Sequence, residues 1–140
     1  MTGDDLGGRA HLPIEETPVF EEFASVADDV WHDVREWDSF AQDTVGKQLV
    51  RATDSIGANL VEGDGRFGGK ESVQFFRIAR GSARESRYWL NRAVSRGLMN
   101  TGQSEQLLSR LTSATRQLNG LITYRVGHLS ASSVREPQTH

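Results

Sequence analysis

Residues 45–69 read VGKQLVRATDSIGANLVEGDGRFGG. Apolar side chains recur every three or four residues from Val45 to Leu60, which is the spacing of one face of an α-helix. Glycines are frequent after Glu62, and because glycine is unfavourable inside a helix they indicate that the helix ends there. The pattern therefore predicts a helix over about 43–62, followed by a flexible connection.

The flanking sequence predicts three more amphipathic helices. The first begins with Thr17 and Pro18, a typical N-cap followed by a residue suited to the first helical position. No alternating pattern typical of a β-strand is found, so we predict an all-α, up-down-up-down four-helix bundle. The predicted helices span about 18–38, 43–62, 70–96 and 103–128, in a bundle over 18–129 between a mobile tail at 1–17 and a disordered tail at 130–140.

Length and composition exclude several classes of protein. The chain has 140 residues and no cysteine, which excludes disulfides, zinc–thiolate sites, iron–sulfur clusters and thiol catalysis. No apolar run approaches the roughly 20 residues that span a bilayer, and no secretory signal is visible. We therefore expect a single cytoplasmic domain without membrane attachment.

Charge is unevenly distributed along the chain. The formal net charge is −3, from 16 basic and 19 acidic residues. Residues 1–65 contain 4 basic and 15 acidic side chains, whereas residues 66–96 contain 8 basic and 2 acidic ones. The predicted third helix is therefore strongly basic, although the chain as a whole is not.

Motifs for cofactors and catalysis are weak. Residues 63–68 match the spacing G-x-G-x-x-G, but a predicted helix rather than a strand precedes them. Asp29 and His32 resemble half of a di-metal site on a bundle helix, but no second carboxylate-x-x-His exists. Neither Ser55 nor Ser82 lies in a Gly-x-Ser-x-Gly motif. We therefore expect no metal, no cofactor and no enzymatic activity.

The predicted third helix carries a basic stripe. Its arginines recur at spacings of three and four residues from Arg77 to Arg87 and fall within about 60° on a helical projection, away from the apolar face. Arginine neutralises phosphates, and an accessible tyrosine stacks on an unpaired base. We infer a surface that binds RNA or DNA. This basic stripe comprises Arg66, Lys70, Arg77, Arg80, Arg84, Arg87, Tyr88, Arg92 and Arg96.

A second interpretation of the same charges remains open. The acidic first helix, of the same subunit or of a neighbouring one, could neutralise the basic stripe. The protein would then be a protein–protein scaffold that assembles through its acidic first helix and its basic third helix.

Polar residues form a row on the predicted second helix, beside its apolar stripe. Their spacings of 4, 4 and 3 residues stack them along the helix, where we expect a partly buried network that fixes helix register. Arg51 is expected to pair with Glu85. Glu62 is expected to pair with Arg80 or Arg84, and direct contact with a ligand is the alternative role. The polar network comprises Arg51, Ser55, Asn59, Glu62 and Glu85.

Two stretches resemble the 23S ribosomal RNA intervening-sequence protein family. Residues 45–63 are similar to its second-helix signature and residues 75–85 to its third-helix signature, within a resemblance over about 19–129. The resemblance implies a four-helix bundle that assembles as a barrel-like homopentamer. The superfamily includes the accessory variability determinant of diversity-generating retroelements, which implies nucleic-acid binding and a reverse transcriptase partner. The signature positions, expected to determine fold and assembly, are Arg51, Ser55, Asn59, Glu62, Gly63, Arg80, Gly81, Ser82 and Glu85.

The acidity of the chain departs from this resemblance. Nucleic-acid-binding relatives tend to be basic, whereas the isoelectric point here is about 5.8. A pentamer would carry a formal charge of about −15, five times the −3 of one chain, and would repel RNA at long range. Nucleic-acid binding therefore requires the arginines to form a surface separate from the acidic residues.

Overall fold

The computed structural model describes residues 12–66 and 69–135, with side chains as far as residue 129. The expected tails at 1–11 and 136–140 lie outside the described residues. Within the described part every element is helical and no strand is present. The elements are the 3-10 turn η1 (Ile14–Glu16), α1 (Pro18–Val34), α2 (Ser39–Ala41), the π-helical turn η2 (Gln42–Gly46), α3 (Lys47–Asp64), α4 (Gly69–Ser95) and α5 (Thr101–Arg135).

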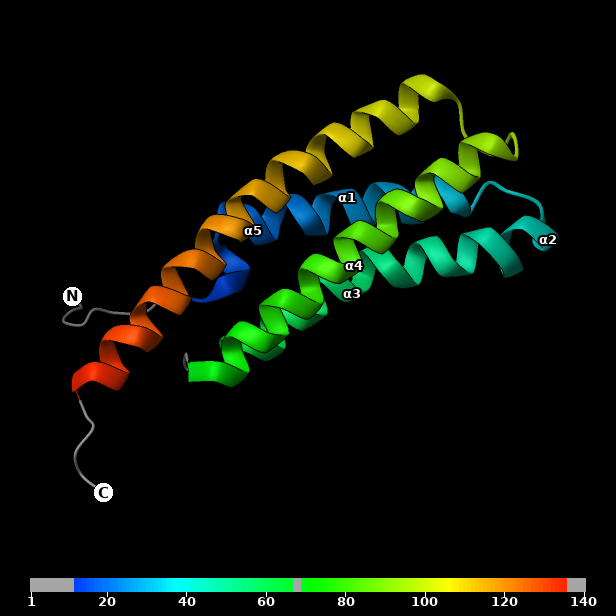
Figure 1. The fold of residues 1–140 in the computed structure, drawn as a ribbon. Coiled ribbons are helices and arrows are strands. Elements are labelled where there is room, and N and C mark those ends of the chain that lie inside the picture. The colour runs from blue at the N-terminus through cyan, green and yellow to red at the C-terminus, as the bar shows by residue number, and fades with distance from the viewer. Residues whose placement is uncertain (1–11, 67–68, 136–140) are drawn as a thin grey trace.

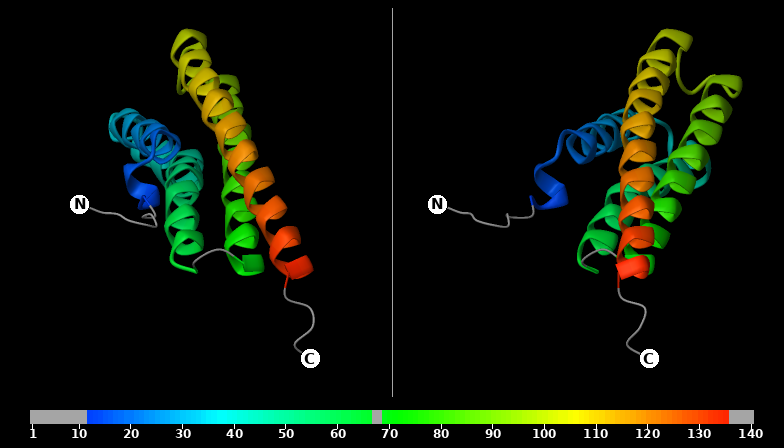
Figure 2. Two further views of the ribbon diagram at one scale, coloured as in Figure 1. Left: turned by 90° about the vertical axis from the view of Figure 1, so that its left-hand side faces the viewer. Right: turned by 60° about the vertical axis from the view of Figure 1, so that its left-hand side comes forward.

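The four long helices pack as a bundle, as predicted. Helix α1 packs on α3 and α5, and α4 packs on the same two helices from the opposite side. Successive long helices run in opposite directions (Figure 1), which gives the up-down-up-down order. Helices α1 and α3 lie on one side of the molecule and α4 and α5 on the other (Figure 2). None of the described helices combines the length and apolar character needed to cross a membrane.

The helix starts follow from capping residues. The Thr17 hydroxyl accepts a hydrogen bond from the Phe20 N–H at 3.3 Å, so the predicted cap is present. Helix α1 ends at Val34, earlier than predicted, because Asp38 adopts an extended conformation and caps the next helix through the Ala41 N–H at 3.0 Å. The second helical segment accordingly begins at Ser39 and passes through a π-helical turn into α3.

Two predicted boundaries of the tails differ in the structure. Residues 12–17, expected in the mobile tail, include the turn η1, where Ile14 is only 3% exposed and joins the core. The Ile14 N–H donates to Asp64 Oδ2 at 3.1 Å, which ties this segment to the end of α3. Helix α5 runs to Arg135, beyond the predicted end near 128. The predicted boundaries lie where apolar residues stop recurring at helical spacing. Neither segment contains a long run with that spacing, so the prediction assigns both to the tails.

The core contains side chains from all four long helices. Gly63 lies where α3 meets α4, and a Cβ there would stand 2.9 Å from both Phe75 Cβ and Phe76 Cε1. Only glycine allows this approach without displacing a buried ring, so a larger residue at this signature position would disturb the packing of α3 against α4. The largest fully buried side chains include Phe23, Leu49, Ile56, Leu60, Phe76, Leu90, Leu111 and Leu118.

Candidate nucleic-acid interface

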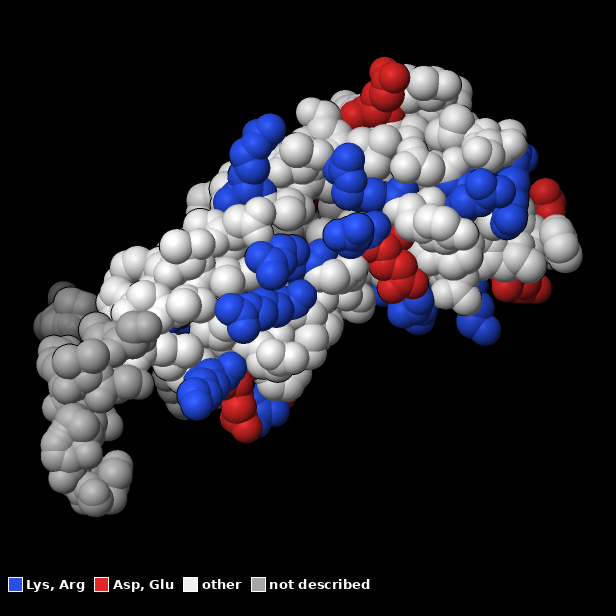
Figure 3. All heavy atoms as spheres, in the orientation of Figure 1, with Lys and Arg blue, Asp and Glu red and all other residues white. Residues whose placement is uncertain are grey.

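The basic stripe lies on the solvent-facing side of α4, apart from Arg66, which follows α3, and Arg96, which follows the last residue of α4. Figure 3 shows Lys and Arg side chains in a row along this helix, with few acidic side chains among them. Every member of the stripe is exposed except Arg92, which is half-buried. The helical spacing of the sequence thus places these residues on one accessible surface.

Two arginines of the stripe reach across to α5. Arg80 Nη1 donates to Asn119 Oδ1 at 3.0 Å, and Arg87 Nη1 donates to Thr112 Oγ1 at 2.6 Å. These acceptors are uncharged, so they orient both guanidinium groups without neutralising them. The positive charge of both side chains therefore remains available to an external anion.

The other cations of the stripe fall into two groups. Arg66 is neutralised, since its guanidinium lies 2.7 Å from Glu62 Oε2 and 3.8 Å from Glu71 Oε1. None of the remaining members forms an ion pair with any described residue. The effective charge of the stripe therefore comes from Lys70, Arg77, Arg80, Arg84, Arg87, Arg92 and Arg96.

Sequence analysis missed one cation near the stripe. Arg116 lies on α5 in the same helical row as Thr112 and Asn119, at spacings of four and three residues. Thr112 and Asn119 accept hydrogen bonds from arginines of α4, so this row of α5 faces the basic stripe. Arg116 belongs to the same row. It is exposed and has no charged partner among the described residues. Only the antiparallel packing of α4 and α5 reveals this, because the sequence separates them widely.

Acidic side chains are concentrated on α1, which packs on α3 and α5. Burial and then the charge of Asp28 raise the pKa of Asp54, which places an α1 carboxylate close to an α3 carboxylate. Burial and then the charge of Asp29 raise the pKa of Asp33, against a lowering by His32. Arg110 of α5 binds α1, and its guanidinium lies 2.8 Å from Glu22 and 2.7 Å from Asp29. Within one chain, α1 therefore engages α5 rather than the basic stripe.

The burial of Asp54, together with its repulsion by Asp28, predicts a pH-dependent stability. Because the pKa of Asp54 is raised above its ordinary value of 3.8, the folded state binds this proton more tightly than the unfolded state. Stability from this group therefore rises as the pH falls through the raised pKa. We expect Asp54→Asn to increase Tm at pH 7, and the gain to vanish below about pH 4. Asp28→Asn should recover part of the same gain, and a lower Tm for Asp54→Asn at pH 7 would contradict the inferred repulsion.

The polar network is only partly as predicted. The predicted pair is present, with Arg51 Nη2 at 2.5 Å from Glu85 Oε2, although the two side chains are 55% and 38% exposed. The prediction for Glu62 is wrong, because Glu62 pairs with Arg66, four residues later in the chain, and not with an arginine of α4. Arg80 is unavailable to α3 because its side chain is directed towards α5.

Of the two remaining members of the network, Ser55 links α3 to α4 by a neutral hydrogen bond. Ser55 Oγ and Ser82 Oγ are 2.7 Å apart, which requires the two helices to approach closely. Asn59 donates to the Ser55 carbonyl at 2.8 Å within α3. Trp89 Nε1 donates to Glu85 Oε2 at 3.1 Å, so one carboxylate joins Arg51 of α3 to Trp89 of α4. The network therefore fixes the register of α3 against α4.

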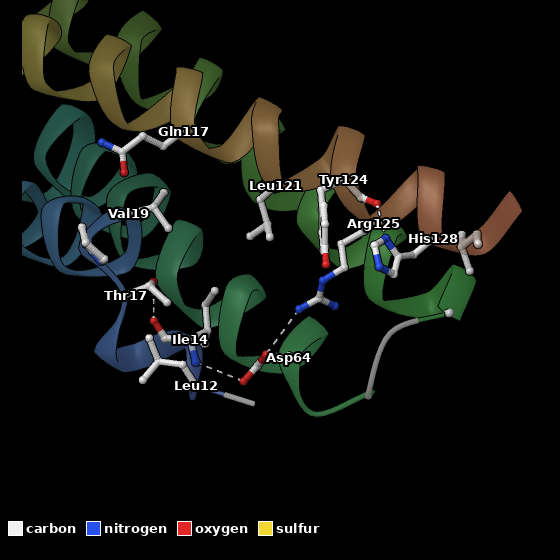
Figure 4. A pocket seen from close by; sticks show the side chains of 13 residues that line it. Leu12, Ile14, Thr17, Val19, Asp64, Gln117, Leu121, Tyr124, Arg125 and His128 are labelled. Carbon is white, nitrogen blue, oxygen red and sulfur yellow. Dashed lines mark hydrogen bonds and ion pairs between the residues drawn. The ribbon is translucent and has the colours of Figure 1, made fainter. Parts of the chain in front are cut away.

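A cavity of about 760 Å³ lies at the end of the bundle, between the N-terminal segment, α3 and α5 (Figure 4). Its walls are largely apolar and include Ile14 and Leu121. Arg125 donates to Ser72 Oγ at 2.8 Å and lies 3.8 Å from Asp64, so its charge is balanced inside the protein. These contacts join α5 to α3 and α4, and Asp64 also accepts the hydrogen bond from the Ile14 N–H of the N-terminal segment. In the described part of the chain, no group of three His, Cys, Asp or Glu residues is arranged to hold a metal.

Comparison with known proteins identifies a family and a fold. Residues 15–120 match the model of a family described as 23S rRNA-intervening sequence protein. A solved structure of a protein of unknown function from the S23 ribosomal protein family of Bacteroides thetaiotaomicron is similar, with a TM-score of 0.66 and 22% sequence identity. The similarity covers 74% of this chain and 97% of that one, and at this identity it shows the fold alone. No curated protein matches the chain.

Proposed function

The chain belongs to the 23S rRNA-intervening sequence protein family, and on that basis we propose that it is a non-enzymatic protein that binds RNA or DNA through its basic stripe. Arg116 of α5 is added to this surface, and Arg66 contributes little because Glu62 and Glu71 neutralise it. The accessory role to a reverse transcriptase that the resemblance implies is part of the proposal.

The observation that carries the proposal is the absence of compensating carboxylates around the stripe. Apart from Arg66, its cations make no ion pair with the residues that the structure describes. Free arginines gain from neutralising phosphates, because each contact releases condensed counterions from the nucleic acid. Neutral acceptors on α5 already orient Arg80 and Arg87, which reduces the conformational entropy lost when they bind.

Separation of the two charged surfaces answers the objection raised by the acidic total. Charges further apart than about 8 to 10 Å are largely screened at physiological salt. A phosphate backbone on α4 therefore interacts mainly with the basic stripe, because the acidic helix α1 packs mainly on α3 and α5. The negative charge of α1 orients the approaching nucleic acid but does not prevent it from binding to the basic stripe.

Salt dependence of the wild-type protein tests the proposal. We expect fluorescence anisotropy to show binding to structured RNA and duplex DNA at about 50 mM salt. If about four phosphates are contacted, the affinity should fall roughly a hundredfold by about 200 mM salt. Absence of binding at the lower salt, or an affinity that does not depend on salt, would contradict the proposal.

The same uncompensated surfaces support a second candidate function. We propose as the alternative a protein–protein scaffold in which α1 of one subunit meets the basic stripe of the next, within the homopentamer that the resemblance implies. Charge complementarity favours this arrangement, because neither side is neutralised by the other within one chain. The two functions compete for the same arginines.

Analytical ultracentrifugation distinguishes the two candidates. An assembly held by these ion pairs should dissociate between about 0.1 and 1 M salt, because screening weakens exposed charge pairs. If the oligomer stays intact at high salt while RNA binding is sensitive to salt, the result supports nucleic-acid binding by the basic stripe and contradicts its use in assembly.

A further inference from the structure

Tyr88 is an exposed aromatic residue among the free arginines of α4. It is 55% exposed and follows Arg77, Gly81 and Arg84 at spacings of 4, 3 and 4 residues, which places all four on one row of the helix. Its neighbours on this row bear charge without a charged partner in the described chain. An aromatic ring in such a row is accessible to a ligand that already contacts the arginines.

Tyr88 packs against Trp89, which is itself held by the polar network. Its ring packs edge-to-face against Trp89, with the ring centroids 4.9 Å apart and an interplanar angle of 78°. Trp89 Nε1 donates to Glu85 Oε2, and the same oxygen receives Arg51 of α3. Trp89 is half-buried and packs against the core. The polar network thus holds in place the ring against which Tyr88 packs.

Gly81 leaves an opening in the same row. A Cβ built on it would meet nothing within 4 Å, and its φ is not in the left-handed region. Neither packing nor backbone conformation within the described chain therefore requires glycine, which is unfavourable in an exposed helix interior. The opening lies between Arg77 and Arg84, about two helical turns before Tyr88. A sugar or phosphate can approach the helix backbone closely at this point.

We propose that Tyr88 stacks on an unpaired base and that the basic stripe consequently prefers single-stranded or looped nucleic acid to duplex. This inference rests on the proposed function, since it specifies the nucleic acid that the same surface binds. In a duplex both faces of each base are covered by its neighbours, so Tyr88 gains a stacking partner only where a base is unpaired. Trp89 and Glu85 act as positioning residues for the ring.

The test compares a single-stranded oligonucleotide of about 20 nucleotides, containing 2-aminopurine, with its duplex. We expect Tyr88→Ala to weaken binding of the single strand by roughly five- to a hundredfold, because base–aromatic stacking contributes that much to affinity, while duplex binding stays the same. Tyr88→Phe should retain the wild-type affinity. Stacking should also quench 2-aminopurine fluorescence with the wild-type protein and Tyr88→Phe, but not with Tyr88→Ala.

Matched variants separate stacking from general effects. Tyr124→Ala removes another exposed tyrosine, on α5 outside the stripe, and should leave binding unchanged. Gly81→Leu should close the opening and lower single-strand affinity, whereas Gly120→Leu, which also meets open space, should not. Circular dichroism would verify that each variant is folded.

The outcomes for the inference and for the proposed function are distinguishable. If charge reversal at Arg77 and Arg84 weakens binding but Tyr88→Ala behaves like the wild type on the single strand, the inference is wrong and the proposed function stands. If charge reversal leaves binding to both oligonucleotides unchanged, the proposed function fails, and the inference fails with it.

Discussion

The double replacement Arg77→Glu with Arg84→Glu is expected to lower the affinity for RNA at least a hundredfold at about 50 mM salt. Both side chains are exposed and lack an ion-pair partner in the described chain, so the change removes two phosphate contacts and adds two repulsive charges. The slope of log affinity against log salt should decrease by about two, one for each lost contact. Fluorescence anisotropy over a salt series measures both quantities.

A control with the same change in net charge makes this result specific. Arg35→Glu with Lys47→Glu also replaces two exposed cations, but near the junction of α1 and α3 rather than on α4. We expect this variant to bind RNA with nearly the wild-type affinity and the wild-type salt slope. Equal losses in the two double variants would assign the effect to total charge and exclude the basic stripe as the binding site.

Phe76→Ala is expected to reduce the free energy of unfolding by about 3 to 5 kcal/mol. The Phe76 side chain is fully buried, its ring edge lies against Gly63 of α3, and the Arg125 guanidinium of α5 stands 5.0 Å from its ring centroid. The substitution therefore leaves a cavity at the contact of three helices. Such a loss is a large fraction of the 5 to 15 kcal/mol that stabilises most domains, so urea unfolding should shift to much lower concentration.

Ile78 provides the comparison for this prediction on the same helix. Its side chain is 43% exposed, so Ile78→Ala should cost about 1 kcal/mol or less. A similar loss for Ile78→Ala and Phe76→Ala would contradict the assignment of the large effect to packing of the buried ring.

The link from the polar network to Tyr88 connects stability with binding. Residues of the second-helix and third-helix signatures meet at the contact between Ser55 and Ser82 and at the pair of Arg51 with Glu85. These contacts fix α3 against α4, as expected of fold determinants. Through Trp89, the same carboxylate also positions the ring that we propose as the stacking platform.

Local sequence was sufficient to predict the features that depend on helical periodicity. The apolar spacing from Val45 to Leu60 predicted a helix, and the spacing of arginines on α4 predicted one basic surface. The pairing of Arg51 with Glu85 was also predicted, because two adjacent helices with polar residues beside their apolar stripes bring such residues together. The apolar stripe and the basic surface each repeat every three to four residues, so a single helix specifies each of them.

Packing between distant segments determined the rest. Ile14 belongs to the core only because the turn η1 is bound by Asp64, fifty residues away in the chain. Glu62 pairs with Arg66 rather than with Arg80 of α4, because the side chain of Arg80 is directed towards α5. Arg116 lies near the basic stripe because α4 and α5 pack antiparallel to each other. Each of these contacts depends on the relative position of two helices, and helical periodicity within one segment carries no information about that position.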